Sequence, residues 1–383
     1  MVKKMTKKIQ NILFTSTKQW NIGDEFIYLG IKNLFNDMGI KYNPILFNRN
    51  PQITKGFDFL NIFKKKNFLK HNFEKNIINS LIYSFFDIVH LDNSINFTHL
   101  CEKWIDKIIF AGTPEWFSLR MKNLYEYAIE YSIPYYFIGI GIHPHTYTLL
   151  NSKILNFKEI IRNASLIITR NKNEGFDVLK KFNNNVYYIG CPALFCSKDE
   201  KKEFEFDKEF LKIGIVFSFP ESPHGHKITF ETFKYILQLI KNLSRFKDIQ
   251  INYIFHYIDD IFYICCKYQK LMNYLSSDGN IYYSHDVYDY FTIYKNMDLI
   301  ISTRVHGNGI ASSLGIPNMH IPHDERADTV RGFGSYVSYK NLDKDIQLIS
   351  RLISSLNEEH SKLINFKYEQ KKKFIDILQE TLD

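Results

Sequence analysis

The sequence predicts an α/β protein made of two doubly wound domains that face each other across a cleft. Short apolar runs alternate with helical stretches along the 383 residues, which is the βαβ pattern of parallel sheets. A charged segment at residues 198–203 interrupts this alternation near the middle. We therefore expect an N-terminal domain over residues 1–200 and a C-terminal domain over residues 201–383. A chain of this length can form two separate cores.

The first domain is expected to start with a strand at residues 12–14, followed by a helix over residues 26–35. Residues 48–75, which are rich in Lys, Asn and Phe, are interpreted as an irregular insertion. A second helix is expected over residues 119–131. The remaining apolar runs predict strands at residues 108–110, 135–140, 166–169 and 187–189.

The second domain repeats the alternation. Apolar runs predict strands at residues 213–217, 251–255, 281–283, 299–302 and 319–321. Helical periodicity is clearest over residues 230–243 and 287–295. Two further helices, at residues 343–356 and 358–378, are expected to close this domain at the carboxyl end of the chain.

Composition limits the functional classes. The net charge is +8, but the basic runs are scattered and no nucleic-acid-binding module is recognisable, so we expect no nucleic-acid partner. No apolar stretch approaches the roughly 20 residues needed to cross a bilayer, and the N-terminal segment lacks a signal-peptide core. We therefore expect a cytoplasmic protein. The basic runs favour peripheral contact with the inner face of the membrane.

Neither a disulfide framework nor a metal site is expected. The five cysteines are odd in number and form no Cys-x-x-Cys pair. Cys191 is interpreted as a small buried residue in preference to a nucleophile. Two close histidine pairs could each be half of a metal site, but the sequence supplies no complete ligand set. These pairs are His143 with His145, and His224 with His226.

The most informative segment follows the predicted strand at residues 299–302. Arg304 and His306 come directly after this strand and precede a small-residue helix that Gly315 and Pro317 should end. They therefore lie at the carboxyl end of a strand, where open α/β sheets bind ligands. A fixed cation beside a group that titrates near pH 7 suits an anionic substrate that needs a proton.

A second segment has the same position after the first strand. Asn21 or Asp24 is well placed to cap the helix that follows, whose first backbone amides can face an anion. Gly23 would let the backbone approach a ligand closely. Asp24 and Glu25 could orient a sugar hydroxyl or act as a base, although acids in a first helical turn are also common as helix stabilisers.

Together the two segments resemble the polysaccharide pyruvyl transferase family. Members typically carry Asn-x-Gly-Asp-Glu after the first strand, matched here by residues 21–25, and Arg-x-His before a Gly-x-Pro end, matched by residues 304–317. Segments at residues 137–141, 166–170 and 254–256 also look similar. The sequence departs from the family pattern at Cys191-Pro192, where relatives often show Asp-Pro, and at Asn171, which is often acidic.

The resemblance implies a two-domain, Rossmann-like fold of the GT-B type. It also implies transfer of a pyruvyl group from phosphoenolpyruvate onto two hydroxyls of a sugar or glycan, with no cofactor and no metal. The acceptor domain would be the first and the donor domain the second. Sugar acceptors in such pathways are often lipid-linked. The sequence gives neither the acceptor sugar nor the oligomeric state.

The chemistry of this reaction selects the candidate residues. Phosphoenolpyruvate carries a phosphate and a carboxylate, and arginine can bind either group bidentately. The donor-binding candidates are Arg170, Arg304, Arg326, Arg331 and His256. His306 is our candidate for the general acid that protonates the donor, and Asp24 or Glu25 for the base. Asn21 and Gly23 are the candidates for acceptor binding.

Two other functions remain open. A GT-B glycosyltransferase would use the same strand-end Arg and His residues to contact the diphosphate of a nucleotide sugar. A non-catalytic member would bind a glycan or a partner protein, and replacing His306 would then leave its output intact. Binding of phosphoenolpyruvate would support pyruvyl transfer, whereas binding of a nucleotide sugar would support glycosyl transfer.

Overall fold

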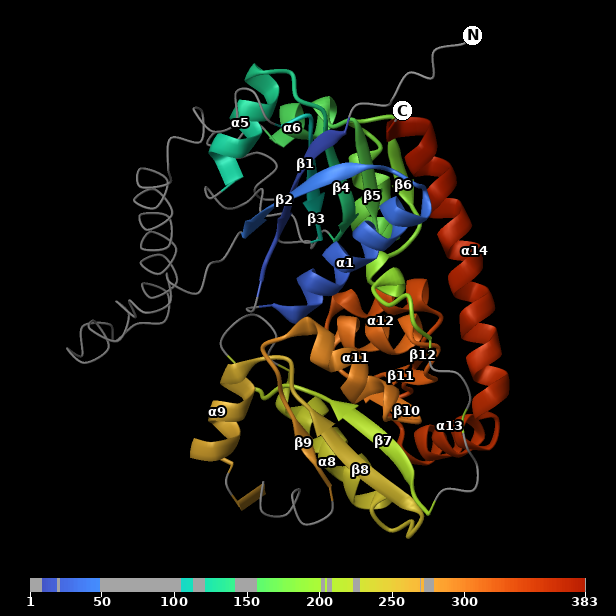
Figure 1. The fold of residues 1–383 in the computed structure, drawn as a ribbon. Helices are drawn as coiled ribbons and strands as arrows, with labels where there is room; N and C mark the ends of the chain where they lie inside the picture. Colours follow the sequence, from blue (N-terminus) through green and yellow to red (C-terminus); the bar gives the residue numbers. More distant parts are fainter. Residues whose placement is uncertain are drawn as a thin grey trace, which may run out of the picture.

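The computed structural model contains two parallel six-stranded sheets, one in each half of the chain (Figure 1). This confirms the predicted α/β class with two doubly wound halves. The structure describes residues 9–18, 21–48, 105–112, 121–141, 157–200, 204, 209–222, 228–268, 270–271 and 279–382. The irregular insertion predicted at residues 48–75 lies almost entirely outside the described residues.

The first sheet has the strand order β2-β1-β3-β4-β5-β6, and all neighbouring strands are parallel. The strands are β1 (Gln10–Ser16), β2 (Tyr42–Asn48), β3 (Lys107–Ala111), β4 (Tyr135–Ile140), β5 (Leu166–Thr169) and β6 (Val186–Tyr188). Strand β2 was not predicted from the sequence. This strand lies at the sheet edge, contains Pro44 and buries little of its length, so it lacks a continuous apolar run.

Helices cover both faces of the first sheet. Alternate side chains of β3 show the division, since Ile108 lies in the core beside α5 (Lys122–Glu130) and α6 (Phe157–Asn163), whereas Ile109 lies in the core beside α1 (Ile22–Asp37). The short helical segments of this half are Lys172–Phe176, α7 (Asp177–Leu179) and a 3₁₀ turn at Pro192–Phe195.

The second sheet has the order β12-β11-β10-β7-β8-β9, again with parallel neighbours. Its strands are β7 (Leu211–Val216), β8 (Ile249–Ile254), β9 (Ile281–Tyr282), β10 (Leu299–Ser302), β11 (Asn318–His320) and β12 (Tyr336–Val337). Its helices are α8 (Phe230–Leu243), α9 (Ile258–Cys266), α11 (Val287–Lys295), α12 (Val305–Ser313) and α13 (Leu342–Ser354), with a 3₁₀ segment at Glu325–Phe333. Neither α9 nor the two-residue β12 was predicted from the sequence.

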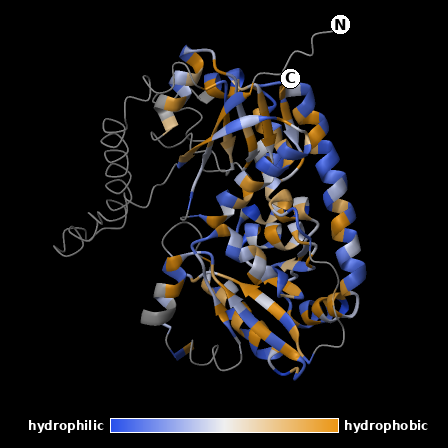
Figure 2. Ribbon diagram, in the orientation of Figure 1, coloured by the Kyte–Doolittle hydropathy of each residue, from blue (hydrophilic) through white to orange (hydrophobic). Residues whose placement is uncertain are grey.

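One apolar core joins the two halves. It includes Phe26 of α1 together with Tyr290 of α11 and Ile310 of α12. The rings of Phe26 and Tyr290 meet edge to face with 6.3 Å between their centroids. Apolar residues are concentrated in the strands and in the helices between the sheets (Figure 2). A continuous hydrophobic interface of this kind restricts relative movement of the halves.

The last helix connects both halves. Helix α14 (Leu356–Leu382) starts beside α13 and runs along the molecule to the first sheet (Figure 1). Its residue Phe374 meets Phe195 with 5.3 Å between ring centroids, and Lys371 pairs with Asp37 of α1. Leu378 and Leu382 of this helix belong to the core that contains residues of both halves.

The strand orders determine where a ligand can bind. The direction in which strands are added reverses between β1 and β3 in the first sheet, and between β7 and β10 in the second. Such switch points open a crevice at the carboxyl ends of the strands. The segments that follow β1 and β10 are the ones that carry the two sequence motifs.

Candidate active site

A pocket lies where strand-end segments of the two halves meet. Segments that follow β1, β5, β8, β10 and β11 all contribute to it. Its lining residues are Asn21, Gly23, Asp24, Arg170, His256, Tyr257, Thr303, Arg304, Val305, His306 and Arg326. The structure thus brings together all of the candidate residues except Glu25 and Arg331.

Asn21 begins α1 and also contacts the opposite half. Its side-chain oxygen accepts a hydrogen bond from the backbone amide of Gly23 at 3.2 Å, which caps the helix. The same oxygen accepts a second hydrogen bond, at 2.8 Å, from the hydroxyl of Tyr257. The N-terminus of α1 is therefore held against the second half by a side chain that lines the pocket.

Gly23 packs directly against His306. A Cβ atom placed on Gly23 would lie 2.1 Å from Nδ1 of His306, a distance that no real contact allows. The glycine is thus needed for close approach of α1 to the imidazole. This contact fixes one edge of the ring.

The two neighbouring acids of α1 have different surroundings. Asp24 lines the pocket, and its Oδ2 accepts a hydrogen bond of 3.5 Å from the Thr17 hydroxyl. Glu25 is buried in the same helical turn but does not line the pocket. Of the lining residues in the described ranges, Asp24 alone carries a carboxyl group.

Arg304 occupies the cap position before α12, directly after β10. Its Nη2 lies 3.4 Å from Oδ2 of Asp260, and its guanidinium lies 4.2 Å above the ring of Tyr257. Asp260 also accepts a hydrogen bond from the Ser218 hydroxyl at 3.4 Å. Burial raises the pKa of Asp260 to about 6, while Arg304 opposes this shift. Arg304 is thus held by a fully buried acid on one side and an aromatic ring on another.

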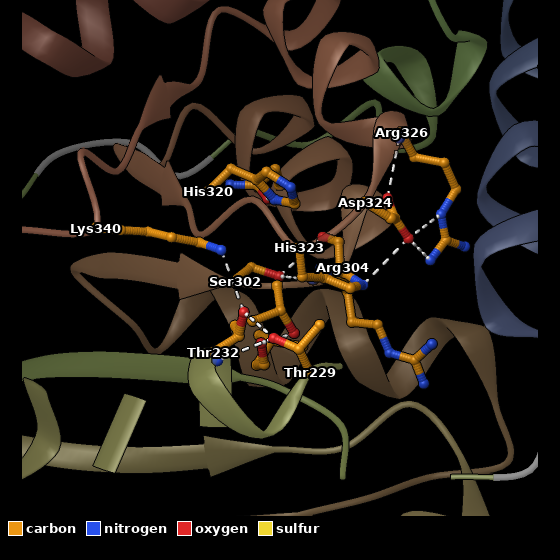
Figure 3. Close-up of polar contacts among 12 residues, drawn as sticks. Thr229, Thr232, Ser302, Arg304, His320, His323, Asp324, Arg326 and Lys340 are labelled. Atoms are coloured by element: carbon orange, nitrogen blue, oxygen red, sulfur yellow. Dashed lines mark hydrogen bonds and ion pairs between the residues drawn. The ribbon is translucent and has the colours of Figure 1, made fainter. Parts of the chain in front are cut away.

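Arg326 is held by its own loop. Asp324 accepts hydrogen bonds from the backbone amide of Arg326 at 2.9 Å and from its Nε at 2.7 Å. Nε2 of His323 lies 3.2 Å from the same carboxylate (Figure 3). Burial lowers the pKa of His323 to about 4, so this histidine is neutral near pH 7. Asp324 therefore orients an arginine that faces the pocket.

Arg331 lies outside the pocket. Its side chain is 76% exposed and its Nε lies 3.5 Å from Oδ1 of Asp328, three residues earlier. Arg331 was predicted to bind the donor together with Arg326 because both residues follow β11. The 3₁₀ segment that contains them turns the two side chains to different places, and such a turn has no clear signature in the sequence.

His306 lies in the first turn of α12 and is surrounded by polar groups. Its Nε2 is 3.1 Å from Nη1 of Arg170 and 3.9 Å from Sγ of Cys191. Burial lowers its pKa well below the ordinary value, and the nearby cations, Arg170 first among them, lower it further. Since guanidinium groups only donate, Nε2 accepts this hydrogen bond and the imidazole is neutral.

His256 is also a neutral residue of the pocket. Its Nε2 lies 2.9 Å from the hydroxyl of Tyr294, and its ring meets that of Tyr290 edge to face at 5.1 Å. Burial, assisted by the charge of Arg304, lowers its pKa to about 3. It can offer hydrogen bonds to a ligand without adding charge.

Three residues that line the pocket, Tyr257, Thr303 and Val305, were not predicted from the sequence, and neither was Asp260, which holds Arg304. Tyr257 follows His256 at the carboxyl end of β8, so the position that identified the histidine would also have identified its neighbour. Asp260 lies on α9, which the sequence pattern did not reveal. Cys191 is indeed buried, as expected, but its contact with His306 could not be read from the sequence.

The described residues contain no group of three or more His, Cys, Asp or Glu side chains that could hold a metal ion. His143, His145, His224 and His226 lie outside the described residues. Within the part of the chain that is described, no helix has both the length and the hydropathy required to cross a bilayer.

Solved structures of sugar-nucleotide enzymes share this architecture. The MnaA protein of Staphylococcus aureus, solved with UDP, is 15% identical, with a TM-score of 0.58 over 98% of this chain and 97% of that one. The UDP-GlcNAc 2-epimerase of Neisseria meningitidis, bound to UDP-GlcNAc, is 14% identical, with a TM-score of 0.53 over 97% and 100%. These similarities establish the GT-B-like fold.

Sequence comparison identifies the family. A search of curated protein sequences found no match. The family model described as polysaccharide pyruvyl transferase matches residues 21–325, which starts at the cap of α1 and ends one residue before Arg326. The match therefore includes both strand-end motifs and most of the pocket. With most of its length covered by this model, the chain belongs to the polysaccharide pyruvyl transferase family.

Proposed function

We propose that this protein transfers a pyruvyl group from phosphoenolpyruvate onto two hydroxyls of a sugar during cell-surface glycan synthesis. The observation that carries the proposal is the convergence of Arg170, Arg304 and Arg326 with His306 in one pocket. A cluster of arginines beside a titratable group suits a small donor with two anionic groups.

The arginines explain selection of the donor. Arg304 and Arg326 are each held by a carboxylate, from Asp260 and Asp324 respectively, so their guanidinium groups have defined positions. Arg170 donates through Nη1 to the neutral imidazole of His306 and also influences the thiol of Cys191. Phosphoenolpyruvate would place its phosphate and carboxylate among these donors, with His256 and Tyr257 as neutral hydrogen-bonding neighbours.

The opposite wall suits the acceptor. Asn21 and the backbone around Gly23 offer polar groups at the start of α1, and Asp24 offers a carboxylate. In this proposal Asp24 takes the proton of the attacking sugar hydroxyl. In this proposal the sugar is bound as a free or lipid-linked acceptor at the cytoplasmic face of the membrane, where the net charge of +8 favours contact with anionic lipid.

The proposed reaction joins two sugar oxygens to C2 of phosphoenolpyruvate and releases inorganic phosphate. One sugar oxygen bonds to C2 of phosphoenolpyruvate while C3 gains a proton from His306 and becomes a methyl group. The bond between C2 and the phosphate oxygen then breaks, and the second sugar oxygen bonds to C2 to close the ketal. The sugar loses two hydroxyl protons. One makes up for the proton that His306 gives to C3, and the other leaves with inorganic phosphate.

Thermal denaturation with candidate donors tests the proposal. A ligand that binds only the native state raises the melting temperature by mass action. Phosphoenolpyruvate should raise it for the parent protein and raise it less for Arg304→Ala. The GT-B-like fold also supports a nucleotide-sugar donor, so UDP-GlcNAc serves as the comparison ligand. Stabilisation by UDP-GlcNAc and none by phosphoenolpyruvate would support the glycosyltransferase alternative, and stabilisation by neither would favour a non-catalytic binding protein.

A further inference from the structure

The resting site holds its proposed acid in a form that cannot give up a proton. Arg170 donates from Nη1 to Nε2 of His306 across 3.1 Å, so the lone pair of Nε2 is occupied. The other ring nitrogen, Nδ1, faces Gly23, where even a methyl group would overlap it. The imidazole is thus neutral, and Nε2 is the nitrogen that must be protonated for acid catalysis.

The groups around His306 do not supply the missing proton. Cations dominate, and they oppose a positive charge on the ring. Asp24 is the one carboxyl group that lines the pocket with it in the described ranges. Cys191 lies 3.9 Å from Nε2, but burial raises the pKa of its thiol, so it remains uncharged. The titratable or charged groups that face the ring or influence it are Asp24, Arg170, Cys191, His256, Tyr257, Arg304 and Arg326.

We propose that Arg170 controls the proton of His306: the anionic donor draws the guanidinium away from Nε2, and the freed nitrogen then takes up one proton from solvent. This inference rests on the proposed function, because it requires a donor with phosphate or carboxylate groups. It gives Arg170 a second role beyond donor binding. The acid becomes active only when a donor is present.

The energetics favour the exchange. Arg170 makes one hydrogen bond, through Nη1, to a neutral acceptor on His306. A phosphate or carboxylate of the donor is oppositely charged and can accept two parallel hydrogen bonds from the guanidinium, so Arg170 gains a better partner when it moves from the imidazole to the donor. The negative charge of the donor also raises the pKa of His306, in opposition to burial and the cations. Both effects favour protonation of Nε2.

Calorimetry of donor binding measures the proposed proton uptake. Phosphoenolpyruvate is titrated into the parent protein at pH 7 in buffers of different ionisation enthalpy, which gives the number of protons taken up. We expect uptake that approaches one proton per donor bound, lost in His306→Gln. Binding with equal uptake in both proteins would overturn this inference and leave the proposed function intact. Absence of binding would overturn the proposed function and, with it, this inference.

Magnetic resonance of the ligand-free protein tests Arg170 separately. With ¹⁵N-labelled histidine, resting His306 should show a neutral ring protonated at Nδ1. Arg170→Gln should raise its pKa more than Arg326→Gln does, because both variants remove one pocket cation but only Arg170 bonds to Nε2. An equal shift in the two variants, or a ring protonated at Nε2 in the parent, would overturn the role given to Arg170.

Discussion

The segments after β1 and β10 occupy equivalent places in two similar sheets but carry different chemistry. Each follows a strand at the switch point of its sheet and starts a helix, α1 or α12. The first segment carries an amide, a glycine and a carboxylate, whereas the second carries a guanidinium and an imidazole. The topology fixes where a site can form, and the residues at the strand ends decide what each wall can bind.

The two segments also depend on each other. Gly23 of the first packs against His306 of the second, and Asn21 accepts a hydrogen bond from Tyr257, whose ring lies beneath Arg304. The wall proposed for the acceptor therefore helps to position the wall proposed for the donor.

The largest effect is expected from the imidazole of the β10 segment. His306→Gln should lower turnover about 100- to 10,000-fold, because glutamine cannot cycle a proton, while donor binding persists. Steady-state kinetics with phosphoenolpyruvate and a competent sugar acceptor measure this. His285→Gln, at an exposed histidine, is the matched control and should retain parental activity. Turnover of His306→Gln within a few-fold of the parent would exclude His306 as the acid.

The next largest loss of turnover is expected from replacing the carboxylate of the β1 segment. Asp24→Asn should lower turnover about 100-fold, since the amide cannot accept the hydroxyl proton. Its neighbour Glu25 lies outside the pocket, so Glu25→Gln should change turnover much less. Both proteins should bind the donor. Equal losses in the two variants would contradict assignment of the base to Asp24.

Replacing the guanidinium of the β10 segment should weaken donor binding more than it lowers turnover. Arg304→Lys keeps the charge but loses the bidentate geometry and the planar contact with Tyr257. Loss of one strong charge-assisted hydrogen bond, about 1.5–3 kcal/mol, should weaken donor binding roughly 10- to 100-fold. The same change at exposed Arg331 is the control and should leave the affinity unchanged. An equal loss at Arg331 would return that residue to the donor site.

A separate effect concerns the stability of the fold, and it arises from the second half. Burial lowers the pKa of His256 and His320 to about 3 and that of His323 to about 4. Between these values and the unfolded value near 6.5, the unfolded chain binds more protons, so stability falls as the pH falls. Each histidine contributes up to about 1.4 kcal/mol per pH unit in that window. The raised pKa of Asp260, about 6, acts in the opposite direction but involves one group.

Urea unfolding at pH 7 and pH 5 measures this dependence. The free energy of unfolding should be lower at pH 5. A variant that removes one buried histidine, such as His320→Gln, should depend less on pH than the parent, whereas His285→Gln should not differ from it. Equal or greater stability of the parent at pH 5 would contradict neutral burial of these histidines.

Much of the fold could be predicted from the sequence because buried parallel strands leave continuous apolar runs. The strands β3, β4, β7 and β10 were all located this way, as were the motifs that follow β1 and β10. Edge strands such as β2 and β12 are short or half-exposed, so they lack this signal. The course of α14 across both halves depends on tertiary contacts that no local pattern contains.

Part of the candidate site could also be predicted from the positions of the strands, but other residues of the site could not. Residues directly after a strand have a known place, which is how Arg170, His256 and Arg304 were found. Asp260 was not found because it lies in the first turn of α9, a helix that the sequence pattern did not reveal, and the exposure of Arg331 depends on the exact turn of its 3₁₀ segment. The contact of Arg170 with His306 joins residues 136 positions apart, which a single sequence does not reveal.

The central claim is that this pocket uses phosphoenolpyruvate as a pyruvyl donor. The direct measurement is to incubate the protein with phosphoenolpyruvate and a panel of sugar acceptors and to follow phosphate and product by nuclear magnetic resonance. The account predicts one inorganic phosphate released for each ketal formed, with a new methyl signal on the product. Consumption of a nucleotide sugar with release of its nucleotide, and no consumption of phosphoenolpyruvate, would contradict it.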